Sequence, residues 1–273
     1  MKLNNIFKKD NNIVIGAVHF PPLFGYSDFP GLDVALESAL EDVKAFEDGG
    51  ADAIIIENNY DVPHLIKVHP KTVEMMVYLG RKIKQKTKLP IGVSVLWNDY
   101  KASLLIAKKI GGKFIRIPVF VDSVKTSYGN VAGESKKVLQ YQRKIRAQGI
   151  ALFTDIHVKH ATLLSKKSIE ASAREAMRAG SDALIITGEW TGDAPNIKEL
   201  SGVRKTVADF PILIGSGADK NNIKKLFRYA NGAIVSTSLK EGSAVKDEVN
   251  IKKWEQRISK DKVKNMTRAI KEN

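Results

Sequence analysis

The sequence contains no cysteine, which excludes both disulfide bonds and catalysis by a thiolate. It also contains no apolar run that approaches the length of a membrane-spanning helix. The opening residues, MKLNNIFKKDNN, lack the apolar stretch of a signal peptide. With 43% hydrophobic and 27% charged residues, the composition is that of a globular protein, and we expect it to be cytoplasmic.

Acidic residues are in deficit, because 30 Asp and Glu stand against 44 Lys and Arg and give a formal net charge of +14. Such an excess suits nucleic acid, an anionic membrane surface or an anionic small molecule. Residues 81–88, RKIKQKTK, carry five bases and no acid, and residues 251–273 carry eight bases and three acids. No aromatic residue interrupts residues 81–88, so stacking on nucleotide bases is not supported. We expect a phosphorylated small molecule and no nucleic acid as partner, with peripheral membrane association as the alternative.

A repeated pattern predicts the architecture. Four segments begin with small or turn-forming residues and continue as an apolar strand: GGADAIII (49–56), GGKFIRI (111–117), AGSDALII (179–186) and YANGAIVS (229–236). Further strands are expected between them, at NIVIGAV (12–18), LPIGVSV (89–95), GIALFTD (149–155) and FPILIGS (210–216). Amphipathic helical patterns fill the intervals.

Eight strands that alternate with helices predict an α/β fold, a single (βα)8 TIM barrel over residues 1–273. We expect the barrel core over about 13–242 and an extra, capping C-terminal helix over about 250–271. A doubly wound open sheet is the alternative, but it seldom has eight strands with such even repeats. Because exposed barrel helices often pair, we also expect a homo-oligomer.

The active site of a TIM barrel lies at the C-terminal ends of its strands, which makes polar residues there candidates for catalysis. The catalytic candidates are His19, Glu57, Asp155, His157 and Lys159. Asp155, His157 and Lys159 are two residues apart, so on an extended strand they would point the same way. Glu57 and Asp155 are the expected proton-exchanging pair.

Alternatives stay open for each of these groups. Glu57 or Asp155 can instead form a structural ion pair with Arg116 or Lys159. Lys159 is expected to neutralise a substrate anion or to pair with Asp155, and a Schiff-base amine is the alternative. His19, His157 and His160 with a carboxylate would make a set of metal ligands, but without tight ligand spacing we expect no metal site. No cofactor is required by the sequence, and a divalent metal remains the alternative.

The loops after the last two strands predict phosphate binding. Gly215, Ser216 and Gly217 follow the seventh strand, and Ser236 and Thr237 follow the eighth, where barrels commonly hold phosphate on backbone N–H groups. The alternative is that the glycines only make a tight turn. Asn221 and Asn222 are expected to cap the helix that starts at Ile223, and Lys240 to lie at the surface or to supply a helper charge.

The remaining substrate-binding candidates come from other strands. Arg116 ends the fourth strand, and Gly188 and Asp193 lie in the long loop after the sixth, with Asp193 as an acceptor for a sugar hydroxyl. The long loops after the first, fourth and sixth strands are expected to cover the site.

Several segments, taken in order, resemble the BtpA/SgcQ family of barrels: IGAVHFPPLFG, GGADAIIIENNYDVP, TDIHVKHA, TGEWTGDAP, IGSG and STSLKEG. The resemblance runs from about Ile13 to Gly242. It implies a barrel similar to the ribulose-phosphate-binding barrels and thus a phosphorylated ligand. The family's name comes from a role in photosystem I biogenesis with membrane association, and other members look like enzymes of sugar or nucleoside metabolism. Members often have glycine where Ser236 stands here.

Two functions of different class follow. The first is an enzyme that acts by acid–base chemistry on a phosphorylated sugar or nucleoside-like molecule, with lyase, isomerase and N-glycosidic hydrolase reactions open. The second is a non-catalytic, membrane-peripheral assembly factor.

Overall fold

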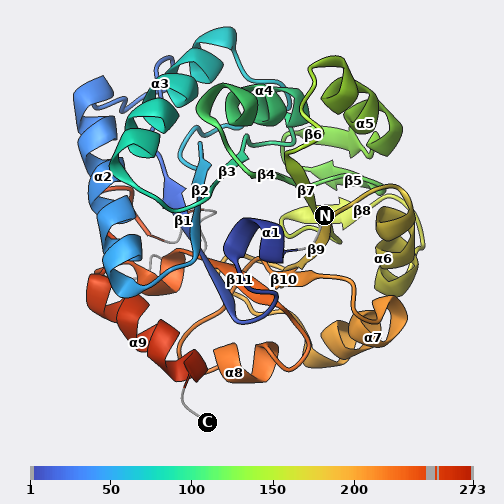
Figure 1. Ribbon diagram of the computed structural model, residues 1–273. Coiled ribbons are helices and arrows are strands. Elements are labelled where there is room, and N and C mark those ends of the chain that lie inside the picture. Colours follow the sequence, from blue (N-terminus) through green and yellow to red (C-terminus); the bar gives the residue numbers. More distant parts are fainter. Residues whose placement is uncertain (1–2, 244–249, 251, 272–273) are drawn as a thin grey trace.

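The computed structural model describes residues 3–243, 250 and 252–271. Within them, eight parallel strands close into a barrel in the order β1-β11-β10-β9-β7-β4-β3-β2, which confirms the predicted fold (Figure 1). The strands are β1 (Ile13–His19), β2 (Ala53–Glu57), β3 (Ile91–Ser94), β4 (Phe114–Ile117), β7 (Ala151–Ile156), β9 (Ala183–Ile186), β10 (Ile212–Ile214) and β11 (Gly232–Val235).

Helices surround the barrel, one after each of its strands (Figure 1). They are α2 (Leu32–Gly49), α3 (Pro70–Lys86), α4 (Tyr100–Ile110), α5 (Ser135–Lys144), α6 (Ile169–Arg178), α7 (Ile197–Val207), α8 (Ile223–Leu226) and α9 (Lys260–Lys271). Gly50 and Gly180 follow α2 and α6 with positive φ angles of 86° and 100°, the role expected from the repeated pattern.

Strand alternation separates two apolar layers. One face of each strand packs outward against the helices, and the other fills the barrel with residues such as Ile15, Ile55, Phe153 and Ile185. At the C-terminal end of each strand, the next inward position carries a polar residue or glycine: His19, Glu57, Ser94, Arg116, Asp155, Thr187, Gly215 and Ser236. The apolar interior therefore gives way to polar side chains at the C-terminal end of the barrel.

The other end of the barrel is closed by the short helix α1 (Asn4–Phe7), which lies across the strand starts in Figure 1. Leu3, Ile6 and Phe7 join the interior apolar cluster. The Phe7 ring lies 5.8 Å from Phe114 and 6.2 Å from Phe153, and those two rings stack at 4.7 Å. The N-terminal end of the barrel is therefore plugged by apolar packing.

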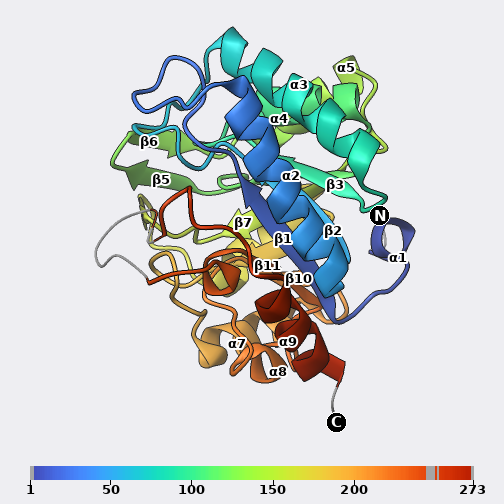
Figure 2. The same cartoon turned by 90° about the vertical axis from the view of Figure 1, so that its left-hand side faces the viewer.

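A small antiparallel sheet lies beyond the C-terminal ends of the strands, opposite α1 (Figure 2). It consists of β5 (Ser123–Thr126), β6 (Gly129–Ala132) and β8 (Ala161–Leu163), with β5 in the middle. The loop after β4 supplies two of its strands and the segment after β7 supplies the third. The long loop expected after the fourth strand thus forms two of the three strands of this sheet.

The C-terminal helix is shorter than the expected range of 250–271, and residues 251, 272 and 273 lie outside the described residues. Residues 252–259 are not helical, because Lys240 and Ile258 form an isolated β-bridge there. α9 lies between α2 and α8, with Val263 against Gly49, and so takes the eighth helical place of the barrel. No described helix combines the length and apolarity needed to cross a lipid bilayer.

Candidate functional site

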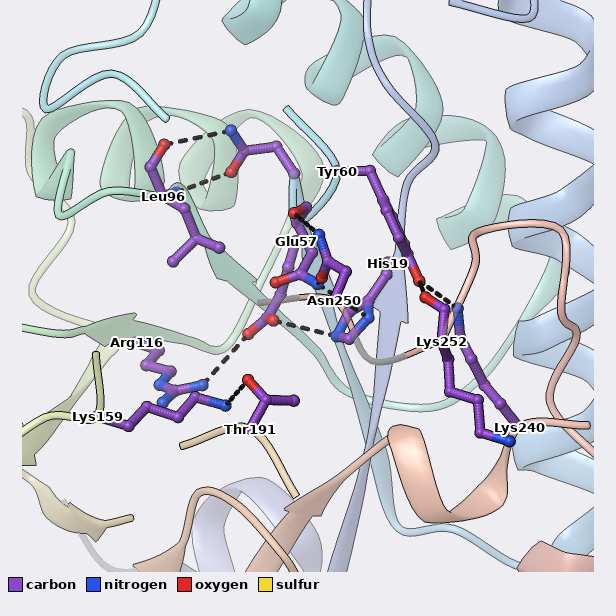
Figure 3. A network of polar contacts seen from close by, with 12 residues as sticks. His19, Glu57, Tyr60, Leu96, Arg116, Lys159, Thr191, Lys240, Asn250 and Lys252 are labelled. Atoms are coloured by element: carbon purple, nitrogen blue, oxygen red, sulfur yellow. Dashed lines mark hydrogen bonds and ion pairs between the residues drawn. The ribbon is translucent and has the colours of Figure 1, made fainter. Parts of the chain in front are cut away.

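The polar ends of the strands enclose a pocket of about 320 Å³, within the range of small-molecule sites. His19, Glu57, Arg116 and Lys159 line it together with the loops that follow β10 and β11. Figure 3 shows these four side chains directed toward one another from β1, β2, β4 and the segment after β7. Residues more than a hundred positions apart thus meet in one cavity.

Arg116 occupies the centre of the charge network. Its Nε and Nη2 atoms donate to the two oxygens of Asp155 at 2.9 and 2.7 Å, a bidentate pair, and Nη1 lies 3.7 Å from Glu57 Oε1. Although burial works against it, the charge of Asp155 raises the pKa of Arg116, so the guanidinium stays ionised. Because both oxygens of Asp155 are held by Arg116, the structural ion pair left open by the sequence is the one that forms.

Glu57 and His19 form the second part of the network. They are register partners on adjacent strands, and His19 Nε2 lies 3.4 Å from Glu57 Oε2. Burial lowers the pKa of His19, against the opposing influence of Glu57. Burial alone would raise the pKa of Glu57, but the hydrogen bond from His19 and the charge of Arg116 outweigh it, so its pKa lies below the ordinary value.

These shifts favour an ionised Glu57 beside a neutral His19. In that state His19 Nε2–H donates to Glu57, and Nδ1 accepts from Asn59 Nδ2 at 3.4 Å. Glu57 Oε1 has no hydrogen-bond partner among the described residues, so it is the atom of this pair that can accept a hydrogen bond from a ligand.

Lys159 reaches the pocket from the segment after β7. Its backbone N–H donates to Thr187 Oγ1 at 3.0 Å, and its Nζ donates to Thr191 Oγ1 at 3.3 Å. Burial lowers the pKa of Lys159 to about 8, with a further lowering by the charge of Arg116. The expected pairing of Lys159 with Asp155 is wrong, because Arg116 already holds that carboxylate.

The glycine-rich loop after β10 contacts the loop after β9 through Ser216 and Gly217. Ser216 Oγ accepts from the Gly188 N–H at 2.8 Å and donates to the Asp193 carbonyl at 2.7 Å, which ties this loop to the one after β9. Gly217 has φ +63°, and a Cβ there would lie 2.1 Å from Ala194 N, so only glycine allows the two loops to touch. Gly217 therefore allows the close approach of the two loops, and its role in phosphate binding stays a prediction.

Ser236 presents a different environment. It is buried in the pocket wall, and its Oγ has no hydrogen-bond partner among the described residues. The N–H groups of Gly217 and Ala218 likewise donate to no acceptor within the described residues. Thr237 and Gly215 also line the pocket. Free donors on both loops are what an anion would require.

Asp155, which Arg116 holds, is not among the pocket-lining residues, and three further candidates lie away from the pocket. His157 was expected to share a face with Asp155, but β7 ends at Ile156 and His157 has φ +50°, so the alternation is broken and its ring contacts Ser172 Oγ at 3.2 Å. Asp193 has an exposed side chain and contributes its carbonyl to Ser216, and Gly188 contributes its N–H to the same hydroxyl. None of the three is among the pocket-lining residues.

The pocket wall also includes Lys240, which was expected at the surface or as a helper charge. It is 2% exposed, so the surface position is wrong, and its role as a helper charge stays a prediction. Its Nζ donates to Tyr60 Oη at 2.9 Å and to the Lys253 carbonyl at 3.3 Å, and Tyr60 Oη donates to the Lys252 carbonyl at 2.5 Å (Figure 3). Lys252 and Lys253, in the segment before α9, thus lie against Tyr60 and Lys240 and help to bury Lys240. In the sequence, the one feature that could have indicated this contact is the position of Tyr60, three residues after Glu57 at the end of β2.

The expected helix cap at Asn222 is also replaced by another contact. The Asn222 side chain makes no capping hydrogen bond to α8, and its Nδ2 donates instead to the Gly217 carbonyl at 2.8 Å. Asn222 therefore stabilises the glycine loop rather than the helix.

Two further histidines line the pocket. His160 Nε2 lies 2.8 Å from Thr191 Oγ1, and burial lowers the pKa of His64 and of His160 to about 4. Both rings are therefore neutral near pH 7. Across residues 3–243, 250 and 252–271, no group of three or more His, Asp or Glu side chains is arranged to hold a metal ion.

Solved structures with a similar fold are TIM barrels of low sequence identity. The (S)-3-O-geranylgeranylglyceryl phosphate synthase of Thermoplasma acidophilum, solved with sn-glycerol-1-phosphate, has a TM-score of 0.61 and 17% identity, with all of both chains covered. The N-(5'-phosphoribosyl)anthranilate isomerase of Pyrococcus furiosus has a TM-score of 0.57 and 12% identity, covering 95% of this chain and 98% of that one. At these identities the likeness supports the barrel alone.

Sequence relatives are much closer. A protein of Pyrococcus horikoshii is 36% identical over 246 residues, which cover 89% of this chain and 93% of that protein. The photosystem I biogenesis protein BtpA of Synechocystis is 33% identical over 243 residues, 88% of this chain and 84% of that protein. The model of the BtpA family matches residues 10–263. Since this match covers almost the whole barrel, the chain belongs to the BtpA family.

Proposed function

We propose that the chain is an enzyme that carries out acid–base chemistry on a phosphorylated sugar or nucleoside-like molecule. The observation that carries the proposal is the meeting of the His19–Glu57 pair, two buried cations and the unpartnered Ser236 hydroxyl in one pocket. A scaffold protein has no need to bury so many ionisable groups around a cavity, since each costs solvation free energy.

Each group has a role that follows from its surroundings. Glu57 and His19 exchange protons with the ligand, because they are adjacent and differently protonated at neutral pH. Arg116 and Lys159 stabilise negative charge that develops on the ligand. Asp155 positions Arg116 rather than exchanging protons, since both its oxygens are engaged.

The loops after β10 and β11 hold the phosphate in this proposal, with Ser236 Oγ and the N–H groups of Gly217 and Ala218 as donors. The names of two barrels of similar fold also refer to phosphorylated compounds, namely sn-glycerol-1-phosphate and a phosphoribosyl compound. Isomerase, lyase and N-glycosidic hydrolase reactions all use a proton-exchanging pair beside stabilising cations.

The first experiment compares matched ligands by thermal shift. Ribose 5-phosphate, glycerol 1-phosphate and AMP are tested beside ribose, glycerol and adenosine. We expect a phosphorylated compound to raise the melting temperature and its unphosphorylated partner not to do so. If no phosphorylated compound stabilises the protein, the proposal fails.

A variant then separates binding from chemistry. Glu57→Gln keeps the shape of the side chain but removes its basicity, so ligand stabilisation should persist while turnover falls by about 10²-fold or more. Glu37→Gln, an exposed position on α2, is the matched control and should change neither. Full turnover by Glu57→Gln would remove Glu57 from the mechanism.

A membrane-peripheral assembly role is the second candidate, and one surface feature favours it. Lys260, Lys264, Arg268 and Lys271 are exposed at helical spacing along α9 and form one basic stripe. Truncation of this helix is an unsuitable test, because Val263 and Met266 are buried in the core.

Charge removal on the surface is a cleaner test of this second candidate. Replacing Lys264, Arg268 and Lys271 by Gln should weaken salt-sensitive binding to phosphatidylglycerol vesicles. The same number of Lys→Gln changes at the exposed positions Lys84, Lys86 and Lys108 is the control. Equal binding by both variants would argue against a membrane role for α9.

A further inference from the structure

Lys159, which is half-buried, has the weakest partner of the cations that line the pocket. Its Nζ makes one hydrogen bond, to Thr191 Oγ1 at 3.3 Å, and no carboxylate among the described residues lies within ion-pairing distance. Buried ammonium groups are normally paired, because an unpaired buried charge is costly. An amine placed in this way calls for an explanation other than charge balance.

The arrangement of the neighbouring groups explains why no partner is available. Arg116 takes both oxygens of Asp155, and Glu57 lies between His19 Nε2 at 3.4 Å and Arg116 Nη1 at 3.7 Å. Lys159 is thus left beside a permanent cation, as Figure 3 shows for Arg116 and Lys159. Its pKa is lowered to about 8 by burial and by Arg116, so an appreciable fraction of the amine is unprotonated near neutral pH. Desolvation and a neighbouring cation are the two conditions that make a lysine nucleophilic.

Lys240 provides an internal comparison in the same pocket. Burial lowers its pKa to about 8 as well. However, its Nζ donates to Tyr60 Oη and to the Lys253 carbonyl, and it lies 5.0 Å from the centre of the Tyr60 ring. Lys240 is therefore held by two hydrogen bonds, whereas Lys159 lines the pocket with one longer hydrogen bond, to Thr191.

We propose that Lys159 is a nucleophile that forms an imine with the carbonyl carbon of a phosphorylated ketose or aldose bound in the pocket. The inference rests on the proposed function, and it narrows the substrate class to compounds with a free aldehyde or ketone group. A hydroxyl group or a closed glycoside gives no such intermediate.

Groups in the pocket can carry every proton transfer that imine formation requires. The Nζ lone pair attacks the carbonyl carbon, the C=O π pair moves to oxygen, and one proton passes from nitrogen to oxygen to give a carbinolamine. An acid then protonates the hydroxyl group, which leaves as water while the nitrogen lone pair forms the C=N bond. The amine, the carbonyl compound and one proton thus yield an iminium ion and water. The proton comes from Lys159 itself: the His19–Glu57 pair, ionised Glu57 beside neutral His19 at rest, takes a proton from the Lys159 ammonium as it becomes the free amine and returns that proton to the departing hydroxyl group.

Trapping by borohydride tests the imine directly. The full-length protein is incubated with dihydroxyacetone phosphate or glyceraldehyde 3-phosphate, reduced with sodium borohydride and examined by intact mass and peptide mapping. We expect one reduced adduct per chain, located on Lys159, and no adduct on Lys240. Glycerol 3-phosphate, which has no carbonyl group, should leave no adduct.

Three variants separate the nucleophile from a merely charged side chain. Lys159→Arg keeps a cation that cannot form an imine, and Lys159→Met keeps the length without charge. Both should lose the adduct by about tenfold or more while Lys159→Arg still gains thermal stability from glycerol 3-phosphate. Lys198→Met, at an exposed position on α7, is the control and should be trapped like the wild type.

The outcomes distinguish this inference from the proposed function. If the carbonyl phosphates stabilise the protein but leave no adduct on Lys159, the imine is refuted and the phosphate site stands. If the adduct spreads over surface lysines or falls on Lys240, the imine is also refuted. If none of the compounds stabilises the protein or leaves an adduct, both the inference and the proposed function fail.

Discussion

The two ends of the barrel are built from the same strands, yet they differ in almost every physical respect. At the N-terminal end, Phe7 packs on the stacked rings of Phe114 and Phe153, and the interior is dry and apolar. At the C-terminal end, the next inward positions carry His19, Glu57 and other polar groups, several without a complete set of partners. We therefore expect apolar packing at the closed end to stabilise the folded protein and the ionisable groups at the open end to destabilise it.

The largest effect is expected from breaking the closed end. Phe153→Ala removes a fully buried ring stacked on Phe114 and should lower the free energy of unfolding by about 3–5 kcal/mol. Urea unfolding followed by circular dichroism measures the loss. At a temperature where the variant is folded, the affinity for a phosphorylated ligand should stay within about twofold of wild type. A loss below about 1 kcal/mol would show that the aromatic plug is not a major source of stability.

Buried Lys240 and half-buried Lys159, both at the open end, should respond to substitution in opposite ways. Lys240→Met leaves the Tyr60 hydroxyl and the Lys253 carbonyl without their partner and should cost about 1–3 kcal/mol. Lys159→Met removes a poorly partnered amine and should be neutral or stabilising by about 1 kcal/mol. Chemical denaturation of both variants gives the comparison. Equal destabilisation would mean that Lys159 is held as firmly as Lys240.

The dependence of stability on pH sharpens the same contrast. The pKa of Lys159 is about 8 in the folded protein and 10.5 ordinarily, so between these values the unfolded chain binds a proton that the folded chain does not. Stability therefore rises as pH increases from about 8 toward 10.5. Lys159→Met should flatten part of this rise, and the contribution of Lys240 is common to both proteins and cancels. A wild-type and a variant curve that run parallel over this window would refute the lowered pKa.

The smallest effect is expected from two serines at neighbouring loops. Ser216→Ala breaks the link between Gly188 and Asp193 and should cost about 1–2 kcal/mol. Ser236→Ala removes an unpartnered hydroxyl and should change stability by no more than about 0.5 kcal/mol. In return, Ser236→Ala should weaken phosphate-dependent stabilisation by about fivefold in Kd, if Ser236 binds the anion. Equal phosphate affinity in both variants would place the anion elsewhere.

Strand periodicity alone was enough to predict where four of the candidate residues lie. His19, Glu57, Arg116 and Asp155 were selected because each follows an apolar strand, and each lies at the inward end of its strand. The prediction was wrong for His157, since its left-handed backbone ends the alternation, and no residue pattern announces that conformation.

Long-range contacts account for the remaining differences. Lys240 is buried because the segment that contains Lys252 and Lys253 packs over it. The hydropathy of the residues around Lys240 cannot predict a contact with a segment more than ten positions away. Asp193 was read as a ligand contact from its place on a glycine turn, whereas the hydroxyl of Ser216 in another loop uses its carbonyl. Both outcomes depend on residues more than ten positions away.

By itself, the sequence determined the barrel, the family and the end of each strand at which polar groups gather, because these depend on the period of apolar residues and on the order of elements. Only the tertiary structure decided which acidic side chain pairs with which basic side chain. Ion pairs form by proximity in space, and the pairing of β4 with β7 in the closed barrel places Arg116 against both oxygens of Asp155. That choice of partner leaves the Lys159 amine with Thr191 and with no carboxylate within ion-pairing distance among the described residues, and it follows from distances that no linear pattern contains.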